Sequence, residues 1–213
     1  MSVTSAAFAA STELRPLPFD AARLNGLSER LIRSHWENNY GGSVKALAVV
    51  KKQLAQALEE KDTPPYVYND LKREHLLRTG SVVLHELYFE NLGGNGNADM
   101  EARNVLSGAF GAYDNWEAEF RRIGLGLGGG SGWVVLGYNS HTGQIENYWL
   151  WDHMHGAAAT IPLLVMDMYE HSYQMDFGAA AAKYIDAFFQ NIRWEAVLER
   201  LERARKCAAV PRP

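Results

Sequence analysis

The stretch that decides the fold of this chain is residues 160–173, TIPLLVMDMYEHSY. It opens with an apolar run, Thr160–Met166, which predicts a buried strand. Asp167 and His171 follow at the end of that strand, and one helical turn there would point both side chains the same way. A carboxylate oxygen beside an imidazole nitrogen suits iron, manganese or zinc. Taken alone, the spacing also fits an exposed acid and histidine with no shared role.

Two further histidines lie upstream on apolar helical faces. His35 belongs to a helix predicted to begin near Ser28, and His85 lies in the apolar segment Val82–Tyr88. Either one alone is more commonly a hydrogen-bonded core residue than a ligand. If two antiparallel helices bring both rings to the strand-end pair, three nitrogens and one anionic oxygen would leave an open coordination position, as metal catalysis requires.

The pattern along the chain changes from helical to mixed near its middle. Periodic apolar residues in the first half predict a helical hairpin, whose arms are separated by Pro64-Pro65. The pair Gly41-Gly42 permits a break or a kink in its first arm. In the second half, three segments rich in β-forming residues predict strands, at 133–138, 144–151 and 160–166. With helices before and after them, these strands predict an α+β layer with a short antiparallel sheet.

The bulk composition excludes several classes of partner. The chain has 213 residues and a net charge of −4, so it lacks the basic surface of a nucleic-acid-binding protein. No apolar run approaches the roughly 20 residues of a membrane span, and we expect no membrane partner. Met1–Ser11 lacks the basic flank of a signal peptide. The single cysteine, Cys207, suits a reducing compartment, so we expect a cytoplasmic protein.

The motifs of this chain resemble those of a known family. The segment Met166–Tyr173 is similar to the signature of iron/manganese superoxide dismutases, Asp-Val-Trp-Glu-His-Ala-Tyr. His35 and His85 fall where that family has its first two ligands. Four further segments match family motifs in the right order: Pro16–Phe19, Asn115–Phe120, Gly132-Trp133 and Asn191–Glu195. The resemblance covers most of residues 16–200.

This resemblance implies a fold, a reaction and an assembly. The fold would be α+β, with an N-terminal helical hairpin domain (16–97) packed on a C-terminal α/β domain (98–213) that holds a three-stranded antiparallel sheet. The site would bind one iron or manganese ion per chain through His35, His85, Asp167 and His171. The substrate would be superoxide, dismuted by alternate reduction and oxidation of the ion. Glu170 would reach the His171 of a second subunit, which implies a homodimer or a dimer of dimers.

The chain departs from the family pattern around this site. Ser43 stands where the family has a gateway tyrosine, and the nearest tyrosine is Tyr40, which we expect to serve instead. The glutamine that bonds the bound solvent is also missing. Its two usual places correspond to Ser81 and to the segment 151–155, where His153 or His155 can act as the donor. We expect His153 to take that role.

Two other departures bear on rate and on metal choice. The arginines that the family has after Asp176 are absent, so electrostatic steering of an anionic substrate would be weaker. Val165 is closer in shape to the threonine of iron enzymes than to the glycine of manganese enzymes. This residue favours iron.

Two alternatives to a dismutase stay open from the sequence. Another mononuclear iron redox enzyme would use the same ligands with an organic substrate, and the altered gateway leaves room for one. A non-catalytic member of the fold would be expected to lose ligands. This chain keeps all four, which argues against the second alternative.

Overall fold

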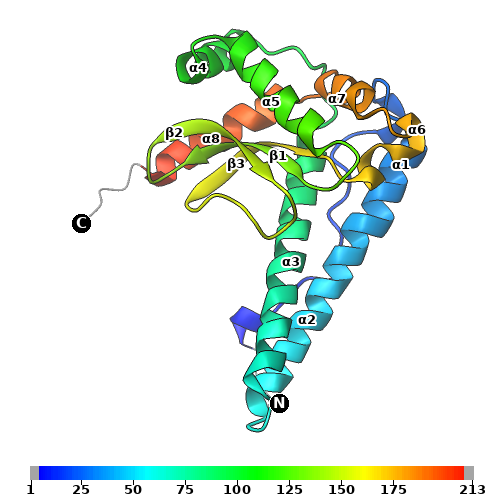
Figure 1. The fold of residues 1–213 in the computed structure, drawn as a ribbon, viewed down its shortest axis with the longest axis vertical. Coiled ribbons are helices and arrows are strands. Elements are labelled where there is room, and N and C mark those ends of the chain that lie inside the picture. The colour runs from blue at the N-terminus through cyan, green and yellow to red at the C-terminus, as the bar shows by residue number, and fades with distance from the viewer. Residues whose placement is uncertain (1–4, 209–213) are drawn as a thin grey trace.

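Two long helices, α2 (Gly41–Glu59) and α3 (Pro65–Glu90), form an N-terminal hairpin in the computed structural model of this chain (Figure 1). The structure describes residues 5–208. Residues 1–4 and 209–213, which include the start of the Met1–Ser11 segment and the end of the predicted C-terminal domain, lie outside the described part. The predicted helical hairpin is confirmed, and its far end extends well beyond the rest of the fold.

The predicted break at Gly41-Gly42 is wrong. The short helix α1 (Glu29–Ser34), capped by the Ser28 hydroxyl, runs directly into a π-helical segment, His35–Tyr40, and then into α2. The chain therefore stays helical through both glycines, and its irregularity lies one turn earlier. A π-helical turn carries one extra residue, which changes the direction of the side chains around it.

The C-terminal half contains the expected three-stranded antiparallel sheet. Its strands are β1 (Trp133–Asn139), β2 (Gln144–Leu150) and β3 (Thr160–Asp167), in the order β2-β1-β3. The register pairs Trp133 with Asp167, at the end of the sheet that faces the hairpin. The central strand and the second half of β3 are buried, so both read as nearly continuous apolar runs.

Helices cover the sheet on its two sides (Figure 1). The described part of the chain completes the fold with five helices: α4 (Met100–Phe110), α5 (Tyr113–Leu127), α6 (Gln174–Phe177), α7 (Ala181–Phe189) and α8 (Trp194–Ala208). Helix α5 packs against β1 and β2, whereas α3 and α8 pack against β3. Helix α5 continues into the glycine-rich run because Gly124 lets it approach Met166 of β3 and Ile185 of α7 closely.

A buried polar cluster ties α3 to β3. The side chain of Asn91, at the end of α3, donates to the Val165 carbonyl at 2.7 Å, and Arg200 of α8 donates to the Leu163 carbonyl at 2.7 Å. Arg200 also bonds the Asn91 side chain and pairs with Glu90 at 2.8 Å. Because these bonds are buried, they hold the hairpin at a definite position relative to the strand that carries Asp167.

The longest helices do not resemble membrane spans. Within residues 5–208, none of the helices is both long and apolar enough to cross a bilayer.

Candidate metal centre

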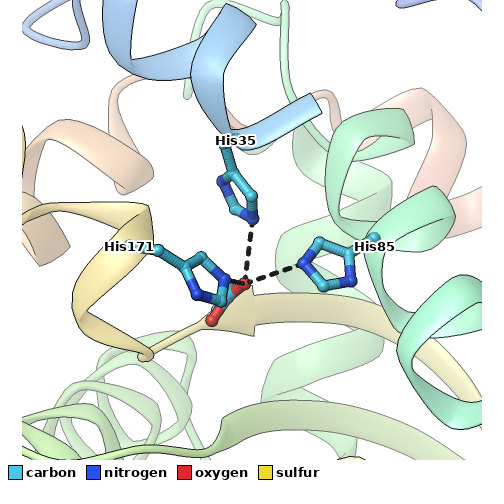
Figure 2. Close-up of side chains that lie close together, drawn as sticks. His35, His85 and His171 are labelled. Atoms are coloured by element: carbon cyan, nitrogen blue, oxygen red, sulfur yellow. Dashed lines mark hydrogen bonds and ion pairs between the residues drawn. The ribbon is translucent and has the colours of Figure 1, made fainter. Parts of the chain in front are cut away.

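Four side chains from separate segments converge between the hairpin and the sheet (Figure 2). His35 is the first residue of the π-helical segment, and His85 lies in α3. Asp167 ends β3, and His171 lies in a 3₁₀ turn directly after it. One potential ligand atom from each residue lies within 4.8 Å of the others. The convergence that the sequence analysis expected is therefore confirmed.

The Asp167 carboxylate is the hub of this cluster. Its Oδ2 lies 3.1 Å from His35 Nε2, 3.1 Å from His171 Nε2 and 3.6 Å from His85 Nε2. Asp167, His35 and His85 are buried, whereas the His171 side chain retains 25% exposure. The cluster is thus closed on three sides and open beside His171.

Unsatisfied nitrogens test whether these residues fit a metal ion. Both ring nitrogens of His35 and the Nε2 of His85 are buried and have no hydrogen-bond partner within the described chain. Leaving buried polar atoms unpaired costs about 1–3 kcal/mol each, and a cation bound by the Nε2 atoms of His35 and His85 removes that cost at both atoms. Three imidazoles and one carboxylate suit iron and manganese, so the donor set fits the expected ion.

The ionisation states also fit a metal site. Burial lowers the pKa of His35, and burial together with the neighbouring His35 lowers the pKa of His85 to about 3. Burial alone would raise the pKa of Asp167, but the charge and hydrogen bond of His171, together with His35 beside the carboxylate, hold this pKa below its ordinary range. At neutral pH His35 and His85 are therefore neutral and Asp167 is ionised, which are the forms that bind metal.

Backbone contacts orient the ligands. His85 Nδ1 lies 2.7 Å from the Ser81 carbonyl, to which it donates, so the lone pair of its Nε2 faces the centre. The Asp167 carbonyl accepts the Tyr184 hydroxyl at 2.6 Å, and Asp167 Oδ1 accepts the Tyr169 backbone N–H at 2.8 Å. Oδ2 is therefore the oxygen left to face the histidines.

His153 lies next to this cluster. Its ring centroid is 5.9 Å from that of His85, and it stacks on Tyr169 at 4.7 Å. The Trp133 indole Nε1 donates to His153 Nδ1 at 3.0 Å. An indole nitrogen can only donate, so Nδ1 is the acceptor and the neutral ring carries its proton on Nε2. Sequence reasoning gave Trp133 no part in the site, although its place in the register beside Asp167 puts it there.

His155, the other candidate donor, lies farther out. Its ring is exposed, and its Nδ1 contacts Asp152 Oδ1 at 2.8 Å and Trp151 Nε1 at 2.7 Å. These contacts tie His155 into the loop after β2.

Tyr40 is buried at the end of the π-helical segment. Its ring centroid lies 6.5 Å from that of His85. Its hydroxyl accepts the Arg15 backbone N–H at 3.1 Å and donates to Glu86 Oε1 at 2.9 Å. A cavity of about 260 Å³ beside it is lined by Tyr40 and Phe89 but by none of the four candidate ligands.

Comparisons with known proteins agree with this geometry. The family described as iron/manganese superoxide dismutases, C-terminal domain, matches residues 98–200. An iron superoxide dismutase of Cupriavidus metallidurans is 48% identical over 192 residues, which cover 90% of this chain and 97% of the relative.

More distant relatives include both metal types. An iron superoxide dismutase of Aquifex pyrophilus is 34% identical over 86% of this chain and 88% of its own length. A manganese superoxide dismutase of Halobacterium salinarum is 30% identical over 90% of this chain and 96% of its own length. The similarity therefore spans nearly the whole length of each relative.

Proposed function

This chain belongs to the iron/manganese superoxide dismutase family, and from that premise we propose that it converts superoxide to oxygen and hydrogen peroxide. The observation that carries the proposal is the convergence of His35, His85, Asp167 and His171, in which the Nε2 atoms of His35 and His85 are buried without a hydrogen-bond partner among residues 5–208. The net reaction consumes two superoxide ions and two protons for each oxygen and peroxide formed.

The four candidate ligands and the ion they would bind have different roles in this reaction. His35, His85, Asp167 and His171 would hold one iron or manganese ion, which would supply the one-electron redox chemistry of the reaction. The ionised Asp167 and the neutral His35 and His85 would give the ion a low net ligand charge.

We propose that His153 is the proton-holding neighbour of the centre. The bond from Trp133 leaves the His153 proton on Nε2, and burial lowers the pKa of this ring. The ring is then neutral at working pH and donates a hydrogen bond through Nε2, as a glutamine amide would do.

Tyr40 stays our candidate for the gateway tyrosine. Its hydroxyl bonds Glu86, the residue directly after a ligand, and burial raises the pKa of Tyr40.

The proposed cofactor is one iron ion per chain, with manganese as the alternative. The relative at 48% identity is named an iron enzyme, whereas the relative at 30% identity is named a manganese enzyme. The Val165 argument from the sequence points the same way.

We also propose a dimer, or a dimer of dimers, in which Glu170 of one subunit bonds His171 of the other. Glu170 is exposed, and His171 uses Nε2 toward Asp167, which leaves Nδ1 as the atom to face a partner. Analytical sedimentation of the wild-type protein and of Glu170→Ala tests this. The wild type should sediment as a dimer or a larger assembly, and the variant should dissociate into monomers at a higher protein concentration than the wild type does. A monomeric wild type would contradict the assembly.

The proposal also covers the domain organisation of the chain and its location in the cell. The family match begins at residue 98, which supports dividing the chain into domains 16–97 and 98–213. The free, exposed Cys207 supports a reducing, cytoplasmic location, which cell fractionation tests.

The decisive experiment is superoxide dismutation by separate iron-loaded and manganese-loaded preparations, each normalised to metal content. Fast turnover with one metal supports the proposal and names the cofactor. Full occupancy with negligible turnover by both would overturn it and favour another mononuclear iron enzyme.

A further inference from the structure

Helix α3 touches the loop that carries His153 at a glycine. A Cβ built on Gly80 would lie 1.8 Å from the carbonyl oxygen and 2.9 Å from the carbonyl carbon of His153. Glycine inside a helix costs about 1 kcal/mol relative to alanine, so its presence here needs a reason. Two other helical glycines, Gly42 and Gly108, would have nothing within 4 Å of an added Cβ.

We propose that Gly80 is a positioning residue for His153. The missing side chain lets the backbone of His153 rest directly on α3, five residues before the ligand His85. This backbone contact places the His153 ring where it accepts the hydrogen bond from Trp133 and stacks on Tyr169. The chemical role of His153 rests on the proposed function, but the seating of its backbone does not.

The local structure of the loop makes this contact stiff. Asp152 Oδ1 accepts the backbone N–H of Met154 at 2.7 Å, which shares its peptide unit with the His153 carbonyl, and the next N–H, of His155, at 3.1 Å. A backbone carbonyl in such a turn cannot rotate away as a side chain would. An alanine at position 80 must therefore push the loop outward by more than an ångström, because contacts under 3.0 Å are not tolerated.

A displacement of that size breaks the bond from Trp133. The Nε1–Nδ1 distance is 3.0 Å, and a further ångström exceeds hydrogen-bond range. The His153 ring then loses the contact that sets its proton on Nε2. Gly80→Ala should thus act on the centre through His153, without touching any ligand.

The test uses the metal-free protein and the NMR signal of the Trp133 indole N–H, assigned by its loss in Trp133→Phe. Gly80→Ala should move this signal to its position in His153→Ala, where the acceptor is gone. Gly42→Ala and Gly108→Ala are matched controls and should leave it unmoved. A wild-type signal in Gly80→Ala overturns the proposal. If that variant does not fold, Gly80→Ala is combined with Asp152→Ala, which loosens the turn, and its indole signal is compared with that of Asp152→Ala alone; the same signal in both overturns the proposal.

A second readout separates positioning from general destabilisation. In metal-loaded protein, Gly80→Ala should lower the dismutation rate in the wild-type background but not in the His153→Ala background. Equal losses in both backgrounds overturn the proposal. If the loaded wild type is inactive while the indole signal still moves, the proposed function fails and the seating of His153 on Gly80 stands.

Discussion

Ser43 and Ser81 face each other across the α2–α3 interface, with their hydroxyl oxygens 2.8 Å apart and both side chains buried. They occupy the two positions where the family resemblance anticipates a gateway tyrosine and a glutamine. Ser81 Oγ also lies 3.3 Å from His85 Nδ1. The large polar side chains of the family pattern are thus replaced by a compact hydroxyl pair, and we propose that the donor to the centre comes instead from the sheet side, through His153.

The Ser43–Ser81 hydrogen bond should contribute to the stability of the hairpin and not to metal binding. Ser43→Ala removes one buried hydrogen bond and should lower the free energy of unfolding by about 1–2 kcal/mol. Urea unfolding of the metal-free protein measures this, with the exposed Thr142→Ala as a control expected to change little. Metal content should not change. A loss of bound metal in Ser43→Ala would show instead that the pair supports His85 directly.

Removing Asp167 should abolish metal binding. Asp167→Ala takes away the only anionic ligand and the atom that lies within 3.1 Å of two of the histidines. Metal per chain, measured after loading and desalting, should fall close to zero, while circular dichroism stays that of a folded protein. Full metal occupancy in this variant would contradict the site.

His153 should matter for rate but not for occupancy. His153→Ala removes the proposed Nε2 donor and should lower the dismutation rate by about 10- to 100-fold, the range typical of partners just outside a metal's ligands. His153→Gln keeps an amide donor and should retain more activity than the alanine variant. Equal rates in all three proteins, each normalised to metal, would remove His153 from the mechanism.

Tyr40 provides a test of the gateway proposal. Tyr40→Phe removes the bonds to Glu86 and to the Arg15 backbone, which should cost about 1–2 kcal/mol of stability. We also expect a lower dismutation rate at unchanged metal content. An unaltered rate across the pH range, together with the stability loss, would leave Tyr40 with a purely structural role.

The metal-free protein should lose stability as the pH falls below about 6.5, the ordinary histidine pKa. The folded-state pKa of His35 is lowered and that of His85 is lowered to about 3. Because these values lie below the unfolded ones, the stabilising contribution is fully present above the unfolded pKa. It is lost progressively as the pH falls toward the folded pKa.

Urea unfolding of the metal-free protein between about pH 8 and about pH 5 measures this loss, with a slope of up to about 1.4 kcal/mol per pH unit for each ring. His85→Gln removes one of the rings and should flatten the dependence. The same unfolding free energy at both ends of the range would contradict the buried neutral state of these histidines.

Local patterns in the sequence were enough for most of the fold. The strand that ends at Asp167 and the turn that follows it are short-range features, so the Asp167/His171 pair is visible in fourteen consecutive residues, 160–173. The hairpin also follows from helical periodicity. Where local reasoning failed, at Gly41-Gly42, the helix on both sides packs against α3, and this packing outweighs the weak helix propensity of glycine.

The residues that surround the four candidate ligands are placed by contacts between distant segments of the chain. The sequence by itself determined the four candidate ligands, since their residue types and faces are local properties, and a resemblance to known motifs joined them. Only the tertiary structure decided that His153 receives its hydrogen bond from Trp133, that Tyr40 bonds Glu86, and that Gly80 seats the His153 backbone. Such contacts depend on how α3, β1 and the loop after β2 pack together, and side-chain periodicity carries no information about the distance between two elements.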